Sequence, residues 1–141
     1  CISVISLRSD TVVATIQLVL DEQVKQYRGI IPFGLAVSPD QKRLYVAESG
    51  INAVAVIDIE KLEVLGHIPV GWFPAKLAVS QDNQQLLVTN AKGYGSGPNG
   101  GPDFTAGPEG SYVGGLMKGS VTVLEIPDQQ PLDSLTQLVI R

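Results

Sequence analysis

Residues 32–48 read PFGLAVSPDQKRLYVAE, and residues 74–90 read PAKLAVSQDNQQLLVTN. The two stretches lie 42 positions apart, and eight of their seventeen positions are identical. The identical pairs are Pro32/Pro74, Leu35/Leu77, Ala36/Ala78, Val37/Val79, Ser38/Ser80, Asp40/Asp82, Leu44/Leu86 and Val46/Val88. A repeat at fixed spacing is typical of proteins that stack one supersecondary unit several times. The fold is therefore decided by this unit and by the number of its copies.

Shorter matches extend the repeat in both directions. Residues 2–7 (ISVISL) match 54–59 (VAVIDI), and 121–126 (VTVLEI) supplies a third copy. Short β-rich runs separated by turn residues such as Ser-Pro-Asp favour antiparallel hairpins. Four such strands in a unit of about 42 residues are typical of a β-propeller blade. The alternative is a β-sandwich whose strands resemble one another by composition.

We therefore predict an all-β fold of two to three consecutive four-stranded antiparallel blades of a β-propeller, an incomplete ring. The predicted segments are a partial propeller at 1–126, with the end of one blade at 1–18, a full blade at 32–70, and a blade at 74–126 with a glycine-rich insertion at 91–120. Residues 127–141 are a connector, where leucine spacing is typical of a short helix with Asp133 or Ser134 as its cap.

The composition of the 141 residues argues against several function classes. A net charge of −4 leaves no basic surface for nucleic acid. One cysteine and one histidine leave no disulfide framework and few routes to metal or histidine-based catalysis. No apolar run approaches the roughly 20 residues of a membrane helix, so we expect no membrane insertion. Because the chain opens on Cys1 inside an apparent strand, we expect a fragment of a longer protein.

Candidate binding or interface residues gather between two units and in the insertion. They are Trp72, Phe73, Asn90, Lys92, Tyr94, Phe104 and Tyr112. Trp72 and Phe73 either line a ligand cleft or wedge between sheets, and the apolar Ile30-Ile31 in the first copy favours wedging. The insertion either caps the propeller and contacts a neighbouring domain, or is a surface excursion.

No catalytic, cofactor-binding or metal-ligating residue is predicted. Residues 95–100 (GSGPNG) match GxGxxG, but Pro98 within the match and Pro102 after it argue against the helix that dinucleotide binding needs. We expect His67 to be a partly exposed strand residue. Asp40, Asp58 and Asp82 are better explained as turn residues than as cation ligands.

At family level, the unit LAVS-x-D-x(3)-L-x-V, followed by VAVIDI and IPVG-x-x-P, resembles the YVTN family of β-propeller repeats. The motif that names the family stands here as Leu87-Val88-Thr89-Asn90 and as Tyr45-Val46-Ala47-Glu48. The resemblance covers about residues 2–126. It implies the fold much more specifically than the function, because such repeats serve many proteins.

A narrower resemblance lies in residues 71–126, through GWFP at 71–74, NAKGYGSGPN at 90–99 and GLMKGS at 115–120. These stretches resemble the end of a propeller that precedes an alkaline-phosphatase-like phosphoesterase domain in secreted bacterial proteins. The resemblance implies a non-catalytic interaction or scaffold segment, located in the periplasm or outside the cell, beside a metal-dependent phosphoesterase domain absent from this chain. None of that domain's catalytic residues is matched here.

The expected partners are the adjoining domain of the parent chain or other copies of this chain, which would associate through open blade faces. One alternative function is a ligand-binding cell-surface propeller for a sugar or polymer. Another is a propeller hydrolase or lactonase.

Overall fold

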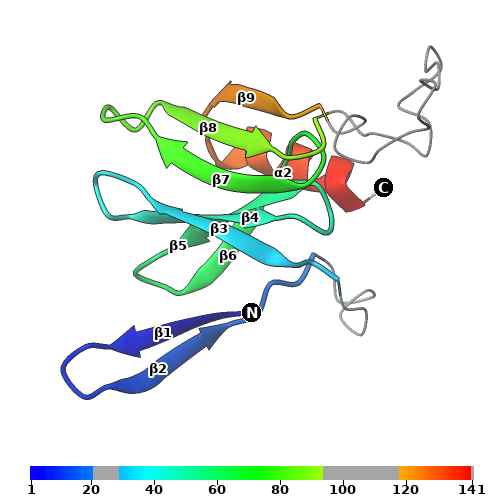
Figure 1. Ribbon diagram of the computed structural model, residues 1–141. Coiled ribbons are helices and arrows are strands. Elements are labelled where there is room, and N and C mark those ends of the chain that lie inside the picture. Colours follow the sequence, from blue (N-terminus) through cyan, green and yellow to red (C-terminus); the bar gives the residue numbers. More distant parts are fainter. Residues whose placement is uncertain (21–28, 94–117, 141) are drawn as a thin grey trace, which may run out of the picture.

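The computed structural model describes residues 1–20, 29–93 and 118–140, in which nine strands form three antiparallel sheets (Figure 1). The first sheet pairs β1 (Ile2–Ser6) with β2 (Thr11–Ile16). The second holds β3 (Pro32–Val37), β4 (Arg43–Glu48), β5 (Ala53–Asp58) and β6 (Glu63–Pro69) in that order. The third holds β7 (Pro74–Val79), β8 (Gln85–Asn90) and β9 (Ser120–Glu125). The prediction of an all-β fold is confirmed.

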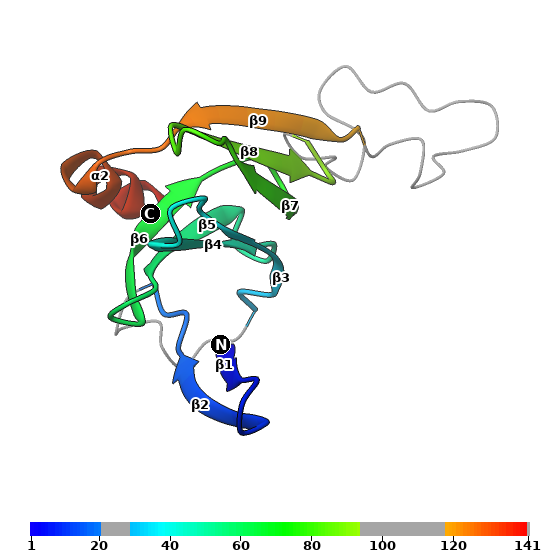
Figure 2. The same cartoon turned by 90° about the vertical axis from the view of Figure 1, so that its left-hand side faces the viewer.

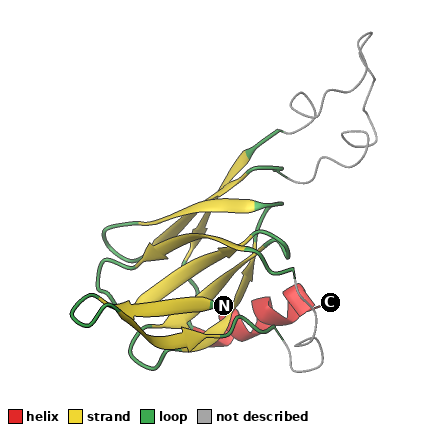
Figure 3. Cartoon of the chain, turned by 60° about the horizontal axis from the view of Figure 1, so that its bottom comes forward, coloured by secondary structure: helices red, strands yellow, loops and turns green. Residues whose placement is uncertain are grey.

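The three sheets stack in chain order, and the helix α2 (Gln129–Ile140) runs along one side of the stack (Figures 2 and 3). Apolar side chains fill the spaces between the sheets. Ile16, Leu18, Val46, Ala55 and Ile57 form the layer between the first and second sheets. Tyr45, Val54, Val56, Ile68, Leu86, Val88 and Leu132 form the layer between the second sheet, the third sheet and α2. The second sheet is therefore covered on both faces.

The sequence repeat is also a repeat of backbone conformation. Non-glycine residues with positive φ recur at equivalent positions, namely Ile31 and Phe73, Gln41 and Asn83, and Asp10 and Leu62. The first two pairs are 42 positions apart and the third is 52 apart, as in the sequence matches. The Ser49 amide donates to the Ile31 carbonyl at 3.0 Å, and the Ala91 amide donates to the Phe73 carbonyl at 2.9 Å. Even sparsely populated conformations are thus copied from one unit to the next.

The outer edge of β6 is satisfied by side chains of α2. The His67 amide donates to Thr136 Oγ1 at 2.8 Å, and Gln129 Nε2 donates to the Leu65 carbonyl at 3.1 Å. Unpaired strand edges otherwise invite pairing with another chain. The helix therefore protects the outermost strand of the second sheet.

Close approach of α2 to β6 depends on Gly66. A Cβ atom at this position would lie 2.8 Å from Leu132 Cγ and 2.6 Å from Thr136 Oγ1. Leu132 is consequently able to reach the apolar layer between the second and third sheets, where it is buried. Glycine serves here to admit the helix rather than to form a turn.

The helix begins earlier than predicted. The Leu132 amide donates to the Asp128 carbonyl at 3.0 Å, so that Asp128 precedes the first turn. The prediction that Asp133 or Ser134 caps the helix is wrong, because Pro131 is tolerated in the first turn, where its missing N–H would have no partner within the helix.

We expect Leu132→Ala to lower the free energy of unfolding by about 2–5 kcal/mol, because it empties a buried position shared by the helix and two sheets. Leu132 is 2% exposed, whereas Leu138 on the same helix is 57% exposed. Leu138→Ala is therefore the matched control, with an expected change within about 0.5 kcal/mol. Urea unfolding followed by circular dichroism measures both, and equal losses would contradict the packing of α2.

Candidate functional site

The most distinctive surface feature lies where β3 and β7 begin. The rings of Phe33 and Phe73 meet edge to face, with centroids 6.1 Å apart and an interplanar angle of 60°. The Lys92 ammonium lies 5.3 Å from the centroid of the Phe73 ring, which is within the range of a cation–π interaction. Phe33 is an exposed residue. The Phe33–Phe73–Lys92 cluster therefore presents aromatic surface beside a positive charge.

The backbone around Phe73 is held by two other connections. Phe73 has a φ of 57°, and its amide donates at 3.0 Å to Asn52 Oδ1 in the turn between β4 and β5. Its carbonyl accepts from the Ala91 amide, and the Lys92 amide donates to the Trp72 carbonyl at 3.1 Å. A non-glycine residue with positive φ is costly and persists only where its surroundings fix it. The turn before β5 and the segment after β8 together hold the backbone from which the Phe73 ring projects.

The structure brings only some of the predicted site residues together. Phe73 and Lys92 join the cluster, and Trp72 lies next to it in sequence with 48% of its surface exposed. Asn90 is instead buried within the stack. Sequence reasoning missed Phe33. The signal that could have found it is that Ala75 stands at the equivalent position of the next unit. An aromatic ring that the repeat itself does not require is a candidate for a separate role.

Three of the predicted residues, Tyr94, Phe104 and Tyr112, lie outside the described residues. The same holds for the GxGxxG match at 95–100 and for most of the insertion predicted at 91–120.

A second candidate is a buried polar pair in the second sheet. His67 Nδ1 lies 2.8 Å from Glu48 Oε2, and both side chains are buried. On the intervening strand β5, Ala53 pairs with Glu48 and Ala55 pairs with His67. These two small side chains leave room for the pair to meet across β5. The prediction that His67 is partly exposed is therefore wrong, because the first sheet covers this face.

At the position equivalent to Glu48, the third sheet also carries a buried polar side chain, but its hydrogen-bond partners are hydroxyl groups instead of a histidine. Asn90 stands 42 positions after Glu48, and its Nδ2 donates to Thr122 Oγ1 at 2.9 Å and to Ser120 Oγ at 3.2 Å. These hydroxyls occupy the positions of the two alanines in the second sheet. Among the described residues, Glu48 Oε1 and Asn90 Oδ1 are the buried side-chain oxygen or nitrogen atoms without a partner.

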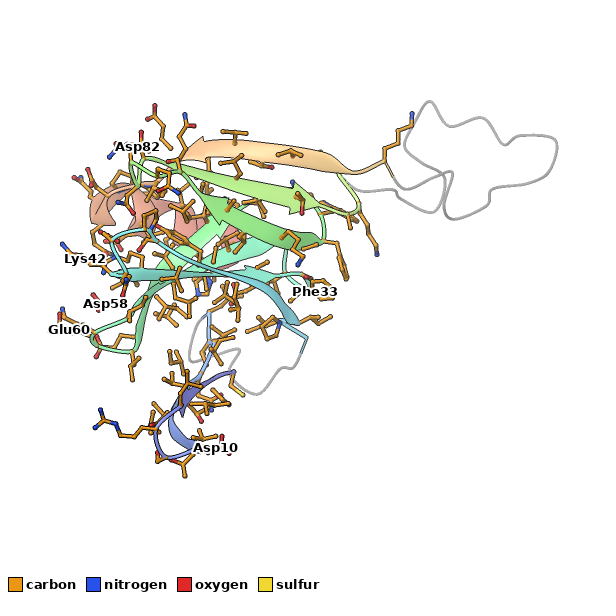
Figure 4. All side chains as sticks on the ribbon, turned by 60° about the vertical axis from the view of Figure 1, so that its left-hand side comes forward. Asp10, Phe33, Lys42, Asp58, Glu60 and Asp82 are labelled. Atoms are coloured by element: carbon orange, nitrogen blue, oxygen red, sulfur yellow. The ribbon has the colours of Figure 1, made fainter. Side chains whose placement is uncertain are left out.

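Asp40 and Asp82 lie in turns and Asp58 is the last residue of β5, and Figure 4 shows Asp58 and Asp82 at the end of the stack away from Phe33. Asp40 Oδ1 accepts from the Ser38 hydroxyl at 2.6 Å and from the Lys42 amide at 3.1 Å. The Ser38 bond is the main cause that lowers the pKa of Asp40, and the Ser80 bond does the same for the pKa of Asp82. The Lys61 amide is the main cause that lowers the pKa of Asp58. These bonds agree with the interpretation of the aspartates as turn residues.

A polar cleft of about 290 Å³ opens between the second and third sheets, beside the start of α2. Arg43, Tyr45, Asn83 and Gln129 are among the residues that line it. Burial raises the pKa of the Tyr45 phenol. The cleft is at the lower limit of the volumes typical of small-molecule sites.

Two further observations concern the described part of the chain. There, no three histidine, cysteine, aspartate or glutamate side chains come close enough together to hold a metal ion. No helix within the described ranges has the length and apolar character needed to cross a membrane.

Comparisons with known proteins give no family. No protein-family model and no curated protein matches the chain. Among solved structures, the chain is similar to Kuenenia stuttgartiensis hydrazine synthase, with 29% identity over 46% of this chain and 18% of that one, and a TM-score of 0.45. A functionally unknown protein from Desulfotomaculum acetoxidans gives 21% identity over 45% of this chain and 21% of that one, with a TM-score of 0.43. The chain thus spans about a fifth of the length of each.

We expect Glu48→Leu to lower the free energy of unfolding by about 1–3 kcal/mol, because it leaves the His67 imidazole buried without its partner. The double variant Glu48→Leu/His67→Leu should regain much of that loss, since an apolar pair of similar volume often replaces a buried polar pair without cost. A double-mutant cycle by urea unfolding measures the coupling. Additive losses would show that the two side chains do not interact.

Proposed function

We propose that this chain is a non-catalytic interaction module made of β-propeller-type repeats, which works by docking a further sheet on the open face of its third sheet. The YVTN-type repeat and the stacking of three antiparallel sheets in chain order support the propeller interpretation. One comparison between equivalent residues of two sheets carries the docking proposal.

That comparison uses residues on one face of each sheet. On the second sheet, the face toward the third is built from Tyr45, Val54 and Val56, all buried. The equivalent residues of the third sheet are Leu87, Val121 and Val123, and all three are exposed, Val121 at 62% and Val123 at 56%. The repeat thus places apolar side chains on the same face of both sheets. In the second sheet that face is buried against the third, and in the third sheet it is exposed. Such a patch is typical of an interaction surface.

At the opposite end of the stack, the outer face of the first sheet is also exposed. Within the described residues the first sheet consists of β1 and β2, and its Ile5 and Val12 are each more than half exposed. The two open faces are unlike, so a contact between copies through them runs head to tail. The partner is accordingly either another copy of this chain or an adjoining domain of a parent chain that offers a comparable sheet.

The narrower proposal, taken from the resemblance alone, is that the adjoining domain is a phosphoesterase and that the protein works in the periplasm or outside the cell. Both remain predictions supported by residues 71–126 of the sequence. The hydrolase or lactonase alternative finds no supporting group of catalytic side chains among the described residues.

A second candidate function is ligand binding at the Phe33–Phe73–Lys92 cluster. Exposed aromatic surface with a few fixed polar groups is typical of binding sites, and here hydrogen bonds from two neighbouring segments hold the backbone of Phe73. A sugar or polymer with an apolar face and anionic groups suits a phenyl ring beside an ammonium group.

The docking proposal predicts that the chain associates in solution. Light scattering after gel filtration should give a mass above the 15.0 kDa of one chain. Val121→Lys should shift the mass toward one chain, because it places a charge on the open face. Leu138→Lys, equally exposed but on α2, is the matched control and should leave the mass unchanged. A monomeric unmodified chain would argue against docking between copies.

The ligand-binding candidate predicts a change in the fluorescence of Trp72, the one tryptophan of the chain, when neutral and acidic oligosaccharides are titrated. We expect saturable change with acidic sugars, and a loss of at least about fivefold in affinity in Phe73→Ala, from about 1 kcal/mol of lost ring contact. Leu138→Ala is the control. A flat response to the whole panel would remove this candidate.

A further inference from the structure

The outer edge of β9 has no neighbouring strand within the described residues, because β9 pairs with β8 alone. Figure 2 shows β9 as the outermost strand of the third sheet. The Ile126 amide donates to the Gln84 carbonyl at 2.8 Å, which fixes the alternation of the antiparallel ladder. By that alternation, the amides and carbonyls of Val121, Val123 and Glu125 point away from β8, toward the free edge.

Every other edge strand that the structure describes has at least one feature that hinders pairing with a further strand. The ladders β1–β2, β3–β4, β5–β6 and β7–β8 each contain a register shift, whereas β8–β9 contains none. β3 and β7 also begin with Pro32 and Pro74, and α2 satisfies the edge of β6. β9 (SVTVLE) has no proline and no lysine. Bulges, prolines, charged side chains and covering helices are devices by which proteins block edge pairing. Within the described residues β9 has none of these except the charge of Glu125 at its end.

The second sheet shows what belongs at this position. Its strand β5 is the equivalent of β9, and its outer edge pairs with β6, so that Val54 faces Ile68 and Val56 faces Gly66. In the third sheet the chain leaves β9 and forms α2, which packs on β6. The place equivalent to β6 is therefore left empty by the described chain.

We propose that the outer edge of β9 accepts one extended strand of a partner polypeptide, which pairs antiparallel to β9 and completes a four-stranded sheet. This binding uses backbone groups at an edge, whereas the docking proposed above uses side chains on a face, so the two are independent. The equivalence with β6 predicts an apolar partner residue opposite Val121.

The partner strand should carry a cation opposite Glu125. In the second sheet the equivalent acid, Asp58, is paired with Arg43 on the neighbouring strand at 2.9 Å. The third sheet has Gln85 at the position of Arg43, so β8 offers Glu125 no such charge. Opposite charges on facing positions of an antiparallel pair stabilise it, and like charges destabilise it.

The probe is a labelled peptide of residues 62–70 (LEVLGHIPV), which copies β6, titrated with the full chain and followed by fluorescence anisotropy. We expect saturable binding. The Glu63→Lys peptide should bind about 2–5-fold more tightly at low salt, since residue 63 would face Glu125. The Gly66→Pro peptide, which lacks an amide that the ladder needs, should bind at least about tenfold more weakly.

Two variants of the chain distinguish binding at the backbone edge of β9 from binding to the side chains on its face. Val123→Pro removes an amide that points outward and leaves the β8–β9 bonds intact, so it should weaken peptide binding about tenfold. Val123→Thr keeps the amide and makes the face more polar, so it should change binding less than about threefold. Equal losses in both variants would overturn the proposal in favour of a side-chain contact on the face.

Hydrogen exchange of the unmodified chain tests the same inference without any variant. The amides of Val121, Val123 and Glu125 should exchange rapidly in the free chain and become protected when the peptide is bound. Protection in the free chain would show that the edge is already paired, and the absence of saturable binding up to millimolar peptide would equally overturn the proposal. Neither result bears on the solution mass of Val121→Lys, which tests docking of sheets.

Discussion

Burial of the second sheet on both faces is the constraint on which the rest of the structure depends. The residues Ala53–Ile57 on β5 are all buried, and they face the two apolar layers in alternation. A strand of this kind cannot stand in a sheet that has water on one side, so it requires a covering sheet above and another below. The first sheet, the third sheet and α2 supply that cover, and each then exposes a surface of its own.

Much of the fold follows from the repeat, because the spacing between the LAVS stretches at 35–38 and 77–80 also sets the spacing of strands, turns and positive φ angles. The start of α2 was less predictable, since a proline reads as a helix boundary unless it stands in the first turn. The burial of His67 was not readable from its own strand. It depends on two alanines of β5 and on a glutamate of β4, and only the sheet register places the four together.

The aromatic cluster, too, is predictable from the sequence only in part. Phe73 and Lys92 stand in stretches that the sequence marks as unusual, and both were predicted as candidates. Their meeting with Phe33 depends on the way two neighbouring sheets bring the starts of β3 and β7 together. No pattern along one strand carries that information, because the ring at position 33 is absent from the second copy of the repeat. Sites built between repeats are for this reason harder to predict than the repeats themselves.

The two buried polar side chains at equivalent positions have a consequence for how such a chain can grow. Glu48 meets His67, and Asn90 meets Ser120 and Thr122, so each finds its partner within its own sheet. The layers between one sheet and the next are filled by apolar side chains. Where polar contacts cross from the second sheet to the third, a side chain meets a backbone group, as Ser49 meets the Pro74 carbonyl and Asn52 meets the Phe73 amide. A unit can therefore be duplicated, exchanged or placed beside a different neighbour without a compensating change across the interface, which favours the spread of the repeat by simple copying.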